Sequence, residues 1–104
     1  MSWVYLLIAG FFEIGFTTFL KLTSGFTKAT PTLLFVTFSI LSFWFLNRAL
    51  HSIPLGIAYA VWTGIGAAGT AVVGILFFED QLSVWKLFFL ANLIGSIIGL
   101  KLVT

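Results

Sequence analysis

Apolar residues form four long runs along the chain, and charged side chains stand mainly at the ends of these runs. The runs extend over residues 3–20, 31–48, 54–78 and 83–102. Each of them approaches or reaches the roughly 20 residues that an α-helix needs to cross the hydrocarbon core of a bilayer. Transmembrane β-strands would instead alternate apolar and polar residues over about ten positions, and the runs show no such alternation. The pattern predicts an all-α membrane protein with four transmembrane helices.

Prolines mark two of the expected helix starts. Pro31 and Pro54 open the second and third runs, and proline is tolerated in a first helical turn because its missing N–H has no intrahelical acceptor there. The connections between the runs are short, and neither a repeat nor a low-complexity segment divides the chain. We therefore expect a single four-helix domain over residues 1–104.

The composition also points to lipid and away from several classes of partner. Hydrophobic residues make up 61% of the chain and charged residues 8%, whereas soluble domains carry about 25% charged residues. The five Lys and Arg are scattered singly, so the sequence has no basic patch for nucleic acid. It has no cysteine and one histidine, His51, and it therefore predicts neither a metal site nor a cofactor. The first run contains Glu13 and has no basic leader, so we interpret it as a permanent span.

Basic residues are divided almost evenly between the two expected sides of the membrane. Arg48 and Lys101 fall on one side, and Lys21, Lys28 and Lys86 on the other. Because loop lysines and arginines orient membrane proteins, a ratio of two to three predicts almost no preference. We expect the chain to insert in both orientations, which permits an antiparallel dimer.

Glu13 stands in the middle of the first span and is the strongest functional candidate. An ionised carboxylate there costs at least about 2.5–3.5 kcal/mol on insertion scales, and intramembrane carboxylates usually mark ion or proton pathways. The alternative is a structural carboxyl that hydrogen-bonds between helices. The helical neighbours of Glu13 include Ala9 and Gly10, which leave a gap for a substrate, pack closely against another helix, or do both.

Further candidates lie in the third and fourth spans. Tyr59 and Trp62 share a helical face and offer aromatic surfaces to organic cations, although such a pair can equally be packing. Gly64 and Gly66 weaken the centre of the longest span and predict a hinge, or else close helix packing. Gly95 and Gly99 form a helix-association motif that predicts a dimer contact.

These residues stand in segments that resemble the small multidrug resistance transporters over nearly the whole chain. The similar segments are AGFFEIGFTTFLK around Glu13, IPLGIAYAVWTGIGA from Ile53 to Ala67, and the ending IGLKL. The resemblance implies a multi-pass protein of the plasma (inner) membrane that is a transporter and no enzyme. It also implies an antiparallel, dual-topology homodimer that exports small organic cations in exchange for protons by alternating access.

The resemblance further implies a shared site in which both copies of Glu13 bind substrate or protons. The residues expected to line it are Glu13, Tyr59, Trp62, Ser42, Gly10 and Phe16. Ser42 and the segment WTGIGA resemble the guanidinium-exporter branch, in which a tryptophan usually stands where this chain has Phe16. Thr17 and Thr18 resemble the branch that exports quaternary ammonium compounds, so both classes of cation are expected substrates.

Two other functions fit a small membrane protein with one buried carboxylate. A passive channel for small cations would use Glu13 to line its pore, and a helper subunit without transport would use Glu13 as a structural contact. Composition and Glu13, taken without the resemblance, leave transport and a structural role equally open.

Overall fold

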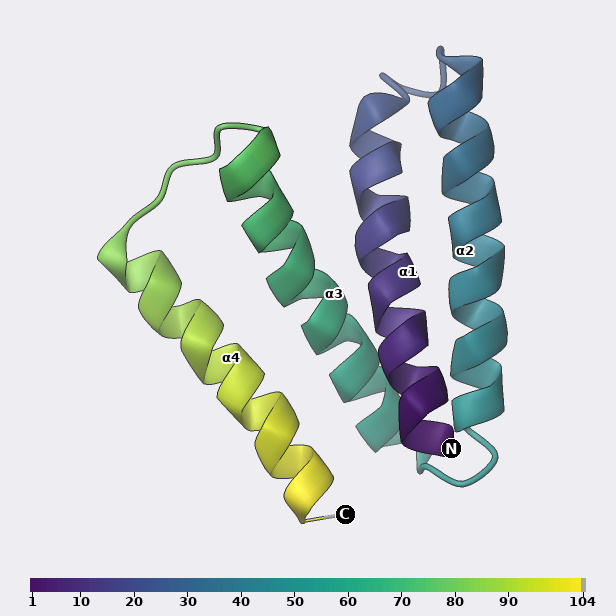
Figure 1. Cartoon of the computed structure of the whole chain (residues 1–104), viewed down its shortest axis with the longest axis vertical. Helices are drawn as coiled ribbons and strands as arrows, with labels where there is room; N and C mark the ends of the chain where they lie inside the picture. Colours follow the sequence, from purple (N-terminus) through teal and green to yellow (C-terminus); the bar gives the residue numbers. More distant parts are fainter. Residues whose placement is uncertain (104) are drawn as a thin grey trace.

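The computed structural model describes residues 1–103, and these form four helices joined by short connections (Figure 1). The helices are α1 (Ser2–Leu22), α2 (Ala29–Ala49), α3 (Leu55–Phe77) and α4 (Val84–Leu102). All four are long and apolar enough to cross a membrane, and the described part of the chain contains no strand. The prediction of an all-α protein with four spans is confirmed.

The helices begin close to where the sequence places them, and the reasons are local. Pro54 precedes α3 as its N-cap, while α2 begins at Ala29, two residues before the expected Pro31. Pro31 still lies in the first turn, where the backbone N–H groups have no intrahelical acceptor. At α4 the Ser83 hydroxyl accepts a hydrogen bond of 3.1 Å from the backbone N–H of Lys86, which is the usual contact of a serine N-cap.

The turn between α1 and α2 uses left-handed backbone conformations. Ser24, Gly25 and Phe26 have φ angles of 50°, 73° and 66°, a region that glycine adopts without steric cost. Thr23 is fully buried, and its hydroxyl donates to the Leu20 carbonyl at 2.7 Å and accepts from the Phe26 N–H at 3.2 Å. This side chain thus holds the end of α1 and the turn together.

Helix α1 packs between α2 and α3, whereas the backbone of α4 approaches that of α3 alone (Figure 1). The helices alternate in direction along the chain, so α1 and α3 run parallel and their last turns lie at the same end of the molecule. The buried core gathers near the opposite end, by the connection from α2 to α3. It consists of Leu6, Ala9, Ala49, Ile53, Ala58, Val61 and Trp62.

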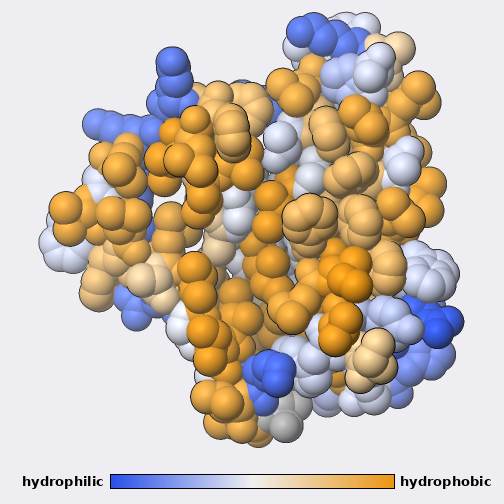
Figure 2. All heavy atoms as spheres, viewed as in Figure 1, coloured by the Kyte–Doolittle hydropathy of each residue, from blue (hydrophilic) through white to orange (hydrophobic). Residues whose placement is uncertain are grey.

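Most of the apolar surface remains exposed. Figure 2 shows apolar residues along the flanks of the helices and hydrophilic residues gathered near the helix ends. None of the residues of α4 is buried. Because a chain in water would bury such side chains, this surface is suited to lipid or to another membrane helix.

Candidate functional site

The Glu13 carboxyl lies in the interface between α1 and α3, directly against Gly66. A Cβ atom added at Gly66 would overlap the carboxyl group of Glu13, so glycine provides the space that this side chain occupies. The Oε1 atom is buried and forms no hydrogen bond with any described residue. A buried polar oxygen without a partner costs free energy. Binding a proton, a cation or a water molecule at this oxygen would lower that cost.

Ser42 connects three helices one turn away from Glu13. It lies on α2, is fully buried, and donates a hydrogen bond of 2.7 Å to the carbonyl of Ala9 on α1. The same hydroxyl accepts a hydrogen bond of 3.0 Å from Nε1 of Trp62 on α3. Ser42 therefore holds the indole ring in one orientation, and Ala9 is the residue four positions before Glu13 on α1.

Aromatic rings continue this site from α1 to α3. The ring centroid of Trp62 lies 5.5 Å from that of Phe43 and 5.9 Å from that of Tyr59. Phe43 in turn lies 6.2 Å from Phe16. Tyr59 is 57% exposed, so the group opens to the surface of the chain there. Such rings attract organic cations within about 6 Å of their centroids.

The predicted glycines divide into two sets. Gly10 faces Ile65, and a Cβ atom added at Gly10 would lie 2.6 Å from that side chain. Gly64 faces Ile97 of α4, and a Cβ atom added there would lie 2.8 Å from the Ile97 side chain. These contacts match the close-packing alternative for both residues. A Cβ atom at Gly95 or Gly99 would meet nothing within 4 Å. Helix α3 runs unbroken past Gly64 and Gly66, so a hinge there stays a prediction.

Two contributors to this site were not predicted from the sequence: the carbonyl of Ala9, which accepts from Ser42, and Phe43, which joins Phe16 to Trp62. A neighbouring contact outside the site was also missed, in which the hydroxyl of Thr70 lies 2.6 Å from that of Thr17. Helical spacing could have identified Thr70, which follows Gly66 by one turn. Backbone carbonyls and one phenylalanine among thirteen carry no such signal.

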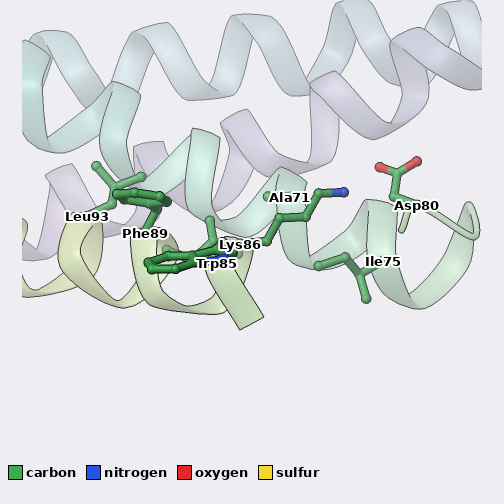
Figure 3. Close-up of a pocket in the computed structure, with 8 residues that line it drawn as sticks. Ala71, Ile75, Asp80, Trp85, Lys86, Phe89 and Leu93 are labelled. Carbon is green, nitrogen blue, oxygen red and sulfur yellow. The ribbon is translucent and has the colours of Figure 1, made fainter. Parts of the chain in front are cut away.

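A cavity of about 460 Å³ lies between α3 and the start of α4 (Figure 3). Figure 3 shows the rings of Trp85 and Phe89 toward one end and the Asp80 carboxylate at the other. The Lys86 ammonium lines this cavity and donates to the Gln81 carbonyl. Because the lining includes neither Glu13 nor the aromatic rings around Trp62, the cavity is separate from the candidate site.

Within residues 1–103, no three His, Asp or Glu side chains come together in a way that could hold a metal ion. Glu13 therefore belongs to no such cluster among these residues. What the site offers is a single carboxyl beside oriented aromatic rings, which suits a cation held by charge and by π faces.

Comparison with known proteins gives one consistent result. Residues 1–93 match the family model described as Small Multidrug Resistance protein. A protein of Proteus vulgaris named Guanidinium exporter is 45% identical over 98% of this chain and 98% of its own length. Proteins with the same name from Citrobacter freundii and Salmonella typhimurium strain LT2 are 46% and 44% identical, over 100% and 98% of this chain and 99% and 97% of their own lengths.

Proposed function

We propose, on the premise that this chain belongs to the small multidrug resistance family, that it exports guanidinium-type cations in exchange for protons. The chain is a multi-pass protein of the inner membrane and a transporter rather than an enzyme. The observation that carries the proposal is the Glu13 carboxyl, which is held inside a membrane span with one buried oxygen that has no hydrogen-bond partner among the described residues. The shared name of the relatives supports guanidinium as the substrate.

Competition between a proton and the organic cation for Glu13 would couple the flux of protons to the flux of cations. A carboxylate can hold either a proton or an organic cation, because binding of one removes the charge that attracts the other. Trp62 supplies an aromatic face for the cation, and the hydrogen bond from its indole N–H to the Ser42 hydroxyl keeps that face in place. Tyr59, Gly10 and Phe16 complete the proposed lining.

An antiparallel homodimer would bring two copies of Glu13 into one chamber. In support of this arrangement, α4 has no buried residue, and the positions beside Gly95 and Gly99 are open. Small residues of this kind allow close approach of helices in membranes. If the chamber opens to one side of the membrane at a time, protons entering from outside displace a cation taken from the cytoplasm.

The proposal is tested by the purified protein in liposomes. We expect labelled guanidinium to accumulate against its own gradient when the interior is more acidic than the medium, and to stop when the pH gradient is dissipated. Guanidinium that only equilibrates, whatever the pH gradient, would support the channel alternative and contradict antiport. Absence of any flux would support the helper alternative.

Topology gives a second prediction. Reporter fusions at the C-terminus should label both sides of the membrane, because loop lysines and arginines are nearly balanced between the two sides. Adding three lysines on one side should force one orientation and lower transport, and co-expression with an oppositely biased copy should restore it. A single orientation for every fusion of the unmodified chain would contradict the dual-topology dimer.

Specificity gives a third prediction, centred on Phe16. Its ring contacts Phe35 and Phe43 at centroid distances of 6.0 Å and 6.2 Å and has no donor to offer. Phe16→Trp would add an indole N–H that can order the hydrogen bonds around Glu13, which favours a small planar ion over bulky ones. We expect the ratio of guanidinium to tetrapropylammonium current to rise severalfold, with phenylguanidinium between them. An unchanged ratio would exclude Phe16 as a specificity residue.

A further inference from the structure

Polar and small residues continue from Glu13 toward the end of the molecule at which α1 and α3 finish. They recur every fourth residue on each helix and therefore share one face. They are Glu13, Thr17 and Lys21 on α1, and Gly66, Thr70 and Gly74 on α3. Because the two helices run parallel and pack together, these faces meet in successive layers. The first two layers are the contact of Glu13 with Gly66 and the hydroxyl pair of Thr17 and Thr70.

The Thr17–Thr70 pair is a short hydrogen bond between helices. The two hydroxyl oxygens lie 2.6 Å apart, and either can be the donor. Thr17 Oγ1 also lies 3.0 Å from the Ile14 carbonyl, which it can reach as a donor. A hydroxyl has one O–H donor and two acceptor lone pairs, so Thr17 passes a proton toward Glu13 only when its O–H turns from the Ile14 carbonyl to a water on the Glu13 side, because the carbonyl itself passes no proton on.

A small cavity adjoins this pair on the side away from the aromatic rings. It has a volume of about 130 Å³, and its lining includes three hydroxyl groups and two charged side chains. These belong to Thr17, Thr18, Thr70, Lys21 and Asp80. One water molecule requires only about 10–15 Å³ of such volume together with two to four polar partners. The cavity therefore satisfies both conditions for holding several water molecules.

Asp80 is folded back onto the end of α3 at the outer end of this cavity. Its backbone N–H donates to the Gly74 carbonyl at 3.0 Å, and a Cβ atom at Gly74 would overlap its carboxylate. The ammonium group of Lys21 lies 4.7 Å from the ring centroid of Phe78. A carboxylate and an ammonium group thus stand where α1 and α3 end, within reach of water at the membrane surface.

The series of polar residues between α1 and α3 ends, inside the membrane span, at the Oε1 atom of Glu13, which has no hydrogen-bond partner among the described residues. Thr17 lies one helical turn farther along α1, and four residues of helix rise about 6 Å. A water molecule between the two side chains can hydrogen-bond to the carboxyl on one side and to the hydroxyl on the other. Trp62 and Ser42 lie one turn in the opposite direction. Glu13 therefore has an aromatic side and a hydroxyl side.

We infer that the Thr17–Thr70 hydroxyl pair and the adjoining cavity form a path by which protons reach and leave Glu13, separate from the aromatic side at which the cation binds. The path rests on the proposed proton exchange. A proton from water enters at the Lys21 and Asp80 end, each hydroxyl or water accepts one proton and gives up another, and the carboxylate ends as a carboxylic acid. Release reverses these steps, so no other bond changes and one proton is moved.

Thr17→Val and Thr70→Val test the path, because valine keeps the shape of threonine and removes its hydroxyl. Two fluxes are measured in the same liposomes: guanidinium uptake driven by a pH gradient, and exchange of labelled for unlabelled guanidinium at equal pH. Exchange needs no proton at Glu13. We expect driven uptake to fall at least about tenfold, since positioned proton-transfer groups contribute about 10²–10⁴-fold to rates, while exchange changes little.

Two further variants serve as controls. Thr37→Val removes an exposed hydroxyl on α2 that bonds the Leu33 carbonyl at 2.8 Å, and it should leave both fluxes unchanged. Thr17→Ser keeps a hydroxyl and should restore driven uptake, which also shows that the site still folds. Equal loss of exchange and driven uptake in Thr17→Val would make the pair a structural contact and overturn the path.

The failures of the two proposals look different. Wild-type protein that shows guanidinium exchange without any pH-driven uptake would refute proton coupling, and the path with it. Wild-type protein that shows both fluxes, together with valine variants that keep both, would refute the path alone.

Discussion

Glu13→Gln is expected to abolish both proton-driven guanidinium uptake and guanidinium exchange while the protein still inserts and dimerises. Glutamine has nearly the same size as glutamate, so it fits the space against Gly66 and keeps hydrogen-bonding capacity, but it can neither carry the exchanged proton nor hold a cation by charge. Removing one partner of a buried ion pair costs about 3–5 kcal/mol, so cation binding should weaken at least about a hundredfold. Liposome flux and binding of labelled guanidinium measure the two losses.

Glu79→Gln is the matched control, because Glu79 lies outside the spans in the connection between α3 and α4. It should transport like the wild type. Retained proton-driven uptake in Glu13→Gln would end the carboxylate mechanism. A variant that fails to fold in detergent would instead favour the structural interpretation of Glu13.

Gly66→Ala is expected to reduce transport at least about tenfold, because the added methyl group occupies the space of the Glu13 carboxyl. Either the carboxyl rotates away from α3 or the two helices move apart, and overpacking of this kind costs about 1–3 kcal/mol. Both outcomes displace the group that binds proton and cation. The measurement is guanidinium exchange, which should fall together with pH-driven uptake.

Gly56→Ala provides the comparison on the same helix. A Cβ atom at Gly56 meets nothing within 4 Å, and alanine favours a helix over glycine by about 1 kcal/mol, so this variant should be at least as stable as the wild type and equally active. Equal activity of the two variants would show that the contact of Glu13 with Gly66 has no role in transport.

The sequence by itself determined the membrane architecture and identified Glu13 as the first functional candidate. Four apolar runs were sufficient to predict the four helices of the structure, because lipid requires each span to satisfy its own backbone hydrogen bonds. Glu13 was identifiable because a carboxylate is costly inside a bilayer, and the other two acidic residues of the chain lie outside the spans. The segments around Glu13 and Trp62 were likewise enough to indicate the family.

Only the tertiary structure decided which faces of these helices meet. The sequence placed Gly64 and Gly66 in the third span, yet it did not show that Gly64 faces α4 while Gly66 receives Glu13. Nor did it show that Thr70 meets Thr17. Helical spacing also did not show the hydrogen bond from the Trp62 indole to Ser42. The physical reason is that lipid is as apolar as a neighbouring helix, so hydrophobicity marks no difference between a lipid-facing surface and a packed one. Steric fit and hydrogen bonds between helices make that choice, and they exist only once the helices are assembled.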